Sequence, residues 1–258
     1  MEPSAEMIGI VGPALAAGFM IILIHVPLGI AVLRRGIIFI DLAIAQIAGL
    51  GALVMGVAWE APPWWAVQMS ALFSAFTAAL FFHQAERYAP QRQEAVIGCG
   101  FVLSASTSIL LLSGQPHGDE MLEKLLSGQL LFANWGELLV HTPVYLLIFT
   151  LWFLRPRMRQ GIYFYLLFSA AITSSVQLAG VFVVFSSLIA PALGASRFAK
   201  TRLELSIAYG VAITGLLSGF GAALWYDLPL GPVLVCCFML AALAAGIWPV
   251  RRVSEAGG

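Results

Sequence analysis

Residues 162–194 read IYFYLLFSAAITSSVQLAGVFVVFSSLIAPALG, an apolar run that contains no charged side chain. A single helix of this length would measure about 50 Å, whereas the hydrocarbon core of a bilayer is about 30 Å thick. Basic residues flank the run on both sides: Arg157 and Arg159 before it, Arg197 and Lys200 after it. If both groups lie on one side of a membrane, the chain must enter and return. We therefore predict two short helices broken near Gly180, or a re-entrant hairpin.

The rest of the chain has the same apolar character. Only 10% of the 258 residues are charged, 60% are hydrophobic, and the mean hydropathy is +0.93. A soluble protein of this size needs more polar surface, whereas side chains that face lipid need no water. Further apolar runs lie at 8–33, 37–58, 64–82, 95–112, 138–154, 205–225 and 229–249. The predicted fold class is all-α, a single polytopic membrane bundle over 1–258 with about eight or nine transmembrane helices.

The basic residues predict the orientation in the membrane, because lysine and arginine are retained preferentially on the cytoplasmic side. Basic junctions alternate with acidic or nearly neutral ones: Arg34 and Arg35, then Arg87 and Arg92, then Arg155, Arg157 and Arg159. The N-terminus, which carries Glu2 and Glu6, is therefore predicted outside and the C-terminus in the cytoplasm. The formal net charge of zero gives no indication of a nucleic-acid partner.

Asp41 is the most informative polar residue, inside the apolar segment IIFIDLAIAQIAG. A carboxylate within a span costs about 2.5–3.5 kcal/mol to insert, so it requires a partner or a wet cavity. His25 lies in the first run, and Gln46 follows Asp41 at a helical rotation of about 140°. Facing one pathway, these three could bind a divalent metal transiently. The alternative is a structural role, with Asp41 near a helix N-terminus and paired with Arg34 or Arg35.

A second group of candidate metal ligands lies between the runs 95–112 and 138–154. His117, Asp119 and Glu120 stand close together on the predicted external side. They could guide a cation or contact a partner protein, and a solvated loop without a ligand role is the alternative. Apolar residues at helical spacing over 121–126 predict a short helix lying in the membrane interface.

Small residues at helical spacing mark faces for close helix contact. Two sets occur: Ala48, Ala52 and Gly56 in the second run, and Gly215, Gly219 and Ala223 in the run 205–225. Packing is the first interpretation of both sets, and a route for solute is the second. Pro191 predicts a further interruption near the end of the long run, with a kink held by packing as the alternative.

Motifs for catalysis and nucleotide binding are missing from the sequence. It contains no G-x-x-x-x-G-K-[S/T] phosphate loop, no glycine-rich dinucleotide fingerprint, and no C-x-x-C or H-E-x-x-H metal site. The chain is therefore predicted not to be an enzyme and to hold no cofactor of its own. Energy for uphill transport would have to come from another subunit or from an ion gradient.

A series of short motifs runs along nearly the whole chain. They are Leu33-Arg34-Arg35 with Phe39-Ile40-Asp41, Glu94-Ala95-Val96-Ile97-Gly98, Leu125-Leu126-Ser127-Gly128-Gln129-Leu130, Ser187-Leu188-Ile189-Ala190-Pro191-Ala192 and Asp227-Leu228-Pro229-Leu230-Gly231-Pro232. In kind and order they resemble motifs of the membrane permease subunits of ABC importers for zinc, manganese and iron. The last two motifs are the most specific.

The resemblance implies partners, cargo and location. It implies a homodimer around a central pathway in the bacterial inner membrane, with a cytoplasmic ABC ATPase dimer beneath it. An extracytoplasmic metal-binding receptor protein would deliver zinc, manganese or iron, of which zinc is the first expectation. The partner subunit, rather than this chain, would use the ATP.

The chain departs from that family in two places. The family usually has a Ser-His pair shortly after the acid of the second span, where Ile44, Ala45 and Gln46 stand here. The cytoplasmic stretch before the sixth span, usually longer, is reduced to 155–160. Coupling to the ATPase is therefore expected over several basic cytoplasmic segments, which contain Arg87, Arg92, Arg157, Arg159, Arg197 and Lys200.

Two other kinds of transporter remain open on the sequence alone. One is a siderophore or corrinoid permease of the same architecture, although chains of that kind are generally longer. The other is a secondary carrier driven by protons or sodium through Asp41.

Overall fold

The computed structural model describes residues 5–115, 118, 120, 126, 128, 130–199, 201 and 203–247, and it contains no strand within these ranges. The helices are α1 (Ala5–Arg35), α2 (Ile40–Ala58), α3 (Trp64–Tyr88), α4 (Gln93–Leu112), α6 (Trp135–Leu154), α7 (Gly161–Ala195), α8 (Glu204–Tyr226) and α9 (Leu230–Ile247). Short 3-10 turns η1 (Pro90–Arg92), η2 (Leu130–Phe132), η3 (Pro156–Arg159) and η4 (Ser196–Phe198) join them. Seven of the described helices are long and apolar enough to cross a membrane, and α9 supplies a shorter apolar helix. The predicted polytopic helical bundle is confirmed.

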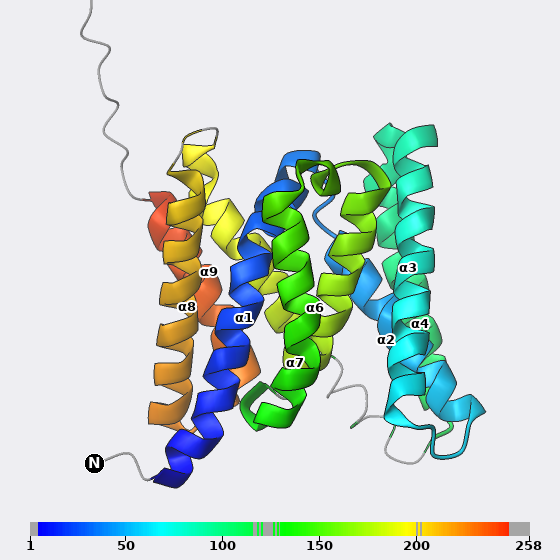
Figure 1. Ribbon diagram of the computed structural model, residues 1–258, viewed down its shortest axis with the longest axis horizontal. Helices are drawn as coiled ribbons and strands as arrows, with labels where there is room; N and C mark the ends of the chain where they lie inside the picture. Colours follow the sequence, from blue (N-terminus) through cyan, green and yellow to red (C-terminus); the bar gives the residue numbers. More distant parts are fainter. Residues whose placement is uncertain are drawn as a thin grey trace, which may run out of the picture.

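Helix α7 contains the break that the sequence predicts. Gly180 has φ 77° and ψ 164°, a backbone conformation that is essentially restricted to glycine. Residues 161–179 run away from the end at which α7 begins, and residues 181–195 run back toward it (Figure 1). At 1.5 Å per residue the two arms measure about 28 Å and about 22 Å, which is near the thickness of the hydrocarbon core. The predicted pair of short helices is confirmed.

Pro191 does not interrupt the second arm, so that prediction is wrong. Gly180 is the non-helical position inside α7, and the helix continues through Pro191 to Ala195. Proline removes one backbone hydrogen bond, which close packing on all sides can compensate. This arm is packed tightly against α1, since a Cβ added at Gly29 would clash with the carbonyl oxygen of Leu188, and against α9, since a Cβ added at Gly194 would lie 3.0 Å from the Cα of Ala242.

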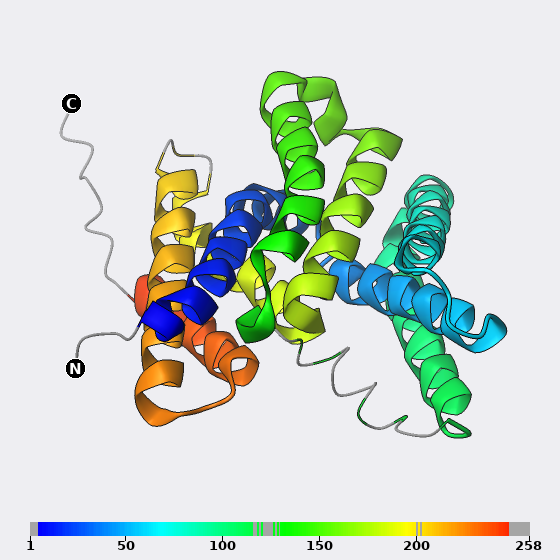
Figure 2. The same ribbon diagram turned by 60° about the horizontal axis from the view of Figure 1, so that its bottom comes forward.

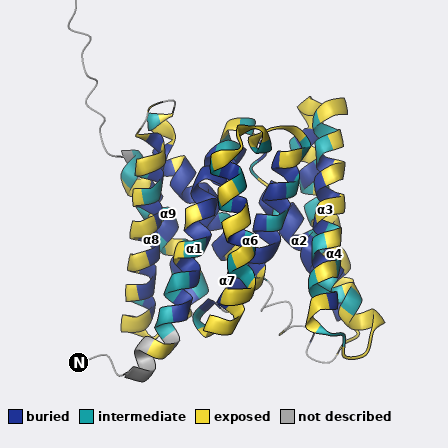
Figure 3. Cartoon of the chain, in the orientation of Figure 1, coloured by how far each residue is buried: buried dark blue, intermediate teal, exposed yellow. Residues whose placement is uncertain are grey.

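The α7 hairpin is the centre of the bundle. It contacts α1, α2, α3, α6, α8 and α9. In an apolar 18-residue stretch of each helix, 83% of the residues are buried in α7, but only 22% are buried in α4 and in α6. Figure 3 shows many exposed positions on the outer helices. Figure 2 shows α1 between α8 and α6, and α2 between α3 and α4. Apolar side chains on the outer helices therefore face the bilayer, whereas α7 faces protein.

The small-residue face of α8 is a packing surface, as predicted. A Cβ at Gly219 would lie 2.6 Å from the Leu234 side chain, and one at Gly215 would lie 2.5 Å from the Phe238 ring. Both neighbours belong to α9. The two glycines therefore allow α8 and α9 to approach closely.

The segments that carry the basic residues contact one another at one end of the bundle, through ion pairs and a hydrogen bond. Arg34 is paired with Glu204, and Arg35 Nη1 lies 3.3 Å from Glu86 Oε1. Arg35 Nη2 donates to the carbonyl oxygen of Arg159 at 2.8 Å. The end of α1 is thus joined to the end of α3, to η3 and to the start of α8. The predicted grouping of these junctions is confirmed, and the N-terminal end of α1 lies at the opposite end of the bundle (Figure 1).

Candidate functional site

Asp41 is buried without a partner in the first turn of α2. Only 1% of the residue is exposed, and neither carboxyl oxygen has a hydrogen-bond partner among the described residues. Arg34 and Arg35 are bound to Glu204 and Glu86, so the predicted pairing of either arginine with Asp41 is wrong. The backbone N–H groups of Asp41 and Leu42 at the start of the helix lie beside the carboxyl, but no side chain of the described residues pairs with it, and a buried carboxyl without a charged partner is costly. Such a group inside a membrane bundle indicates a functional site.

Glu94, in the first turn of α4, provides a second carboxylate near the start of α2. Its Oε1 accepts a hydrogen bond from the backbone N–H of Phe39 at 3.1 Å, two residues before Asp41. Its Oε2 is buried and has no partner within the described part of the chain. Glu94 begins one of the motifs quoted above, but this role was not predicted for it, because an acidic residue in the first turn of a helix is common for reasons of the helix dipole alone.

A cavity of about 520 Å³ opens between α2, α3, the end of α4 and the first arm of α7. Its polar lining residues are Gln115, Thr173 and Gln177. The Thr173 hydroxyl is buried and without a partner among the described residues. The remaining lining residues are apolar: Ala48, Gly49, Ala52, Leu53, Gly56, Val57, Val67, Ala71, Leu112 and Val176. The wall is thus mainly apolar with a few polar groups, the usual composition of a small-ligand site.

The small-residue face of α2 forms part of the wall of this cavity. Gly56 has no atom within 4 Å of an added Cβ, so the packing interpretation fails at Gly56, whereas Ala48 is buried in the apolar core and Ala52 packs against that core. The close contact between α2 and α3 lies at Gly51, where an added Cβ would lie 2.9 Å from the Ser70 carbonyl oxygen. Ser70 also donates its hydroxyl proton to the carbonyl oxygen of Gly51 at 2.7 Å.

Asp41 shares a helical face with the cavity wall. Positions 41, 45, 48 and 52 follow i, i+4, i+7, i+11 spacing, which places them along one side of α2. The residues after Asp41 on this face are Ala45, Ala48 and Ala52. On α2 itself, only small side chains separate the carboxyl group from the cavity, over about 10 Å along the helix axis.

His25 binds hydroxyl groups on both arms of α7. Its Nδ1 lies 2.8 Å from Ser187 Oγ on the second arm, and its Nε2 lies 2.9 Å from Ser175 Oγ on the first. The Tyr145 hydroxyl of α6 lies 2.5 Å from Ser175 Oγ. The His25 ring is fully buried. Because this ring of α1 connects both arms across the Gly180 break, the network fixes the hairpin.

The other predicted site residues are dispersed. Gln46 is buried in α2, and Glu120 is exposed. His117, Asp119 and Lys200, together with most of the predicted interfacial helix over 121–126, lie outside the described residues. No group of three or more His, Cys, Asp and Glu side chains able to hold a metal ion occurs in the described part of the chain. A metal role for Asp41, His25 or Gln46 stays a prediction.

The arginines predicted to couple to an ATPase are exposed. They are Arg87, Arg92, Arg157, Arg159 and Arg197. They belong to α3, η1, η3 and η4, whose ends lie at the basic end of the bundle (Figure 1). Their location is compatible with a docking surface, and the coupling role stays a prediction.

Replacing His25 with phenylalanine should destabilise the bundle by about 1–2 kcal/mol, the scale of interhelical hydrogen bonds in membranes. The ring volume is nearly kept, while both bonds to the α7 arms are lost. Thermal unfolding in detergent measures the effect.

A double variant tests the network itself. Adding Ser187→Ala to His25→Phe should cost little further stability, because the His25 ring that Ser187 contacts is already gone. Ser186→Ala is the control, since Ser186 donates to the carbonyl oxygen of Val183 in its own helix. Full additivity of His25→Phe and Ser187→Ala would contradict the network.

Comparison with known proteins identifies the family. The profile of the ABC 3 transport family matches residues 7–160 and 156–248. No curated protein matches the chain. Among solved structures, PsaBC from Streptococcus pneumoniae in complex with Fab contains a similar chain, with a TM-score of 0.69 and 17% sequence identity over 92% of this chain and 90% of that chain. That likeness establishes the fold, and the family match covers most of the sequence. The chain belongs to the ABC 3 transport family and is a multi-pass membrane subunit of an ABC transporter.

Proposed function

We propose that this chain is the permease subunit of an ATP-driven importer for a divalent metal ion, with zinc first and manganese or iron as the alternatives. The observation that carries the proposal is the buried carboxyl of Asp41, which has no partner among the described residues and lies on the helical face that lines the cavity. Oxygen ligands of this kind suit hard and borderline divalent cations. The family match supports the transport role.

We assign the pathway to the α2 face that runs from the cavity to Asp41. A cation would enter the cavity at the end of the bundle opposite the basic junctions and pass Ala52, Ala48 and Ala45 to reach the carboxyl. Glu94 Oε2 is a second oxygen near the start of α2. This direction corresponds to import if the basic end is cytoplasmic, as the distribution of arginines predicts.

The remaining parts of the proposed importer come from other chains. Two copies would line the pathway together, since the outer half of α2 is exposed in one copy at Val54, Gly56 and Val57. A pair of ABC ATPase subunits would dock at the exposed arginines of the basic end and drive alternating access. A metal-binding receptor protein would deliver the cation at the opposite end.

Proteoliposomes that contain the chain with its partner ATPase test the proposal. Receptor-delivered zinc, manganese and iron should each be offered with and without ATP in the ATPase compartment. ATP-dependent uptake of one or more of these metals is expected. Uptake driven by a proton or sodium gradient without the ATPase would select a secondary carrier instead. Uptake of an organic chelate but of no free metal would select a siderophore or corrinoid permease.

Filling the cavity should block transport without unfolding the protein. Ala52 is half-buried on the cavity wall, so Ala52→Phe places a ring in open space and should reduce uptake to near background. Val140→Phe is the matched control, because Val140 lies on α6, outside the cavity lining, with 52% of its surface exposed. Metal uptake and the elution profile in detergent are measured for both. Equal uptake by the two variants would place the pathway elsewhere.

A further inference from the structure

A second cavity lies at the basic end of the bundle. Its volume is about 530 Å³, and it opens between α1, α6 and α8. Its charged lining residues are Arg34, Arg35, Arg159 and Glu204, and most of the others are apolar. Its lining residues come mainly from α1 and from α6 and α8, the helices that flank α1 in Figure 2. None of its residues belongs to the pathway assigned to α2, and Arg159 is shared with the arginines proposed above for ATPase docking.

The charged part of this cavity is predominantly positive. Three arginines and one glutamate line it. Glu204 is paired with Arg34, whose side chain is nevertheless 56% exposed. Arg159 donates from Nε to the carbonyl oxygen of Trp152 at 2.8 Å, and no carboxylate of the described residues forms an ion pair with it. Each guanidinium has five N–H donors, so donors remain for an anion.

The other part of the cavity is apolar. Pro27 and Ile30 of α1 are buried, Trp152 and Phe153 belong to α6, and Leu205 belongs to α8. The Arg159 guanidinium lies 5.6 Å from the centre of the Trp152 ring, at the boundary between the two parts. A ligand that fits this lining has an anionic group beside an aliphatic chain.

We propose that the cavity binds an anionic phospholipid from the surrounding leaflet. The headgroup phosphate would contact Arg34, Arg35 and Arg159, and an acyl chain would lie against Trp152 and Leu205. Basic cavities between membrane helices at the headgroup level are suited to such lipids. The proposal depends on the membrane location of the chain and is independent of the metal that it transports.

Native mass spectrometry of the purified full-length chain with mixed phosphatidylcholine and phosphatidylglycerol tests the assignment. The wild type should retain phosphatidylglycerol in preference to phosphatidylcholine. Arg159→Gln should weaken that retention about fivefold, the effect expected for one arginine at a charged headgroup. Arg159→Lys keeps the charge and should retain most of the preference.

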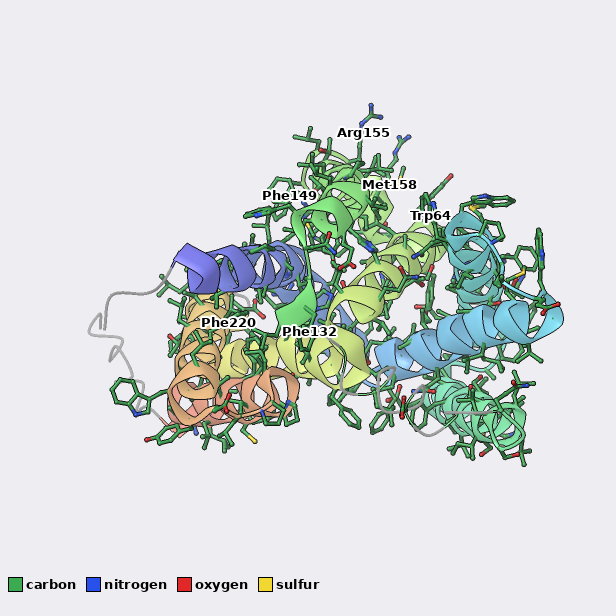
Figure 4. All side chains as sticks on the ribbon, turned by 90° about the horizontal axis from the view of Figure 1, so that it is seen from below. Trp64, Phe132, Phe149, Arg155, Met158 and Phe220 are labelled. Carbon is green, nitrogen blue, oxygen red and sulfur yellow. The ribbon has the colours of Figure 1, made fainter. Side chains whose placement is uncertain are left out.

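Arg155→Gln is the matched control. It removes the same charge from the same linker, but Arg155 is not part of the cavity lining, and Figure 4 shows its side chain projecting away from the bundle. Phosphatidylglycerol retention by Arg155→Gln should equal that of the wild type. Thermal unfolding of each variant confirms that the fold is kept.

Three results would overturn the assignment. Equal losses in Arg155→Gln and Arg159→Gln would show that diffuse surface charge attracts the lipid. Displacement of phosphatidylglycerol by inorganic phosphate at the same concentration would show that the apolar wall contributes nothing. Unchanged lipid retention with lost ATPase binding in Arg159→Gln would assign the cavity to the partner protein.

Discussion

Replacing Asp41 with asparagine is expected to reduce metal transport by on the order of a hundredfold, the upper range for losing a group that supports a metal site. The amide has nearly the volume of the carboxyl but lacks the negative charge that would attract a cation. The stability of the bundle should stay the same or increase, because an unpartnered buried carboxyl is removed. A structural residue would behave in the opposite way, with stability lost first.

Two measurements on the same preparation separate these outcomes. Metal uptake by proteoliposomes with the partner ATPase reports transport, and thermal unfolding in detergent reports stability. Asp227→Asn is the control, because Asp227 is an exposed carboxylate that ends α8 in a left-handed conformation, which asparagine also adopts readily. Wild-type uptake by Asp41→Asn would assign Asp41 a structural role and remove the main support for the proposed pathway.

Replacing Gly180 with alanine is expected to destabilise the hairpin of α7 strongly. The conformation at φ 77° and ψ 164° costs about 1–3 kcal/mol for a residue with a side chain. Gly128 lies against the same point, since a Cβ added there would clash with the backbone of Ala179 and Gly180. Little free space therefore exists for the backbone at 180 to relax. The expected result is a large fall in the yield of monodisperse protein and in its unfolding temperature.

Gly221→Ala provides the comparison for this substitution. Gly221 is an exposed helical glycine of α8 with no atom within 4 Å of an added Cβ. Alanine should be neutral or slightly stabilising there, because it has the higher helix propensity. If Gly180→Ala and Gly221→Ala unfold at the same temperature as the wild type, the reversal of α7 does not depend on glycine and the hairpin geometry is wrong.

The membrane spans and the hairpin could be predicted because they depend on local quantities. Hydropathy over about 20 residues and the thickness of the bilayer limit where each helix begins and ends. The basic groups on both sides of 162–194 then require the chain to reverse, and Gly180 is the residue in the middle of the run that tolerates a reversal. Pro191 was misleading because packing around a proline in a helix is not visible in the sequence.

The partners of buried polar residues could not be predicted in this way. His25 bonds to serines 150 and 162 residues away, and Arg34 pairs with a glutamate 170 residues away. Local spacing suggested that Arg34 or Arg35 would neutralise Asp41, yet both have carboxylate partners from distant helices. Which carboxylate an arginine pairs with depends on the complete arrangement of the helices. The absence of an arginine partner for Asp41 can therefore be seen only in the folded chain.

The central position of α7 has a consequence for biogenesis. A ribosome completes α1 to α4 well before it reaches residue 161, yet α1 and α3 bury much of their protein-facing surface against α7. Early in synthesis these helices must therefore remain beside the translocon or in lipid, with the surface that will contact α7 still uncovered. Asp41 of α2 is already within the membrane at that stage. Final assembly of the nascent subunit therefore waits for its last third, and chains that stop before the hairpin should be substrates for membrane quality-control proteases.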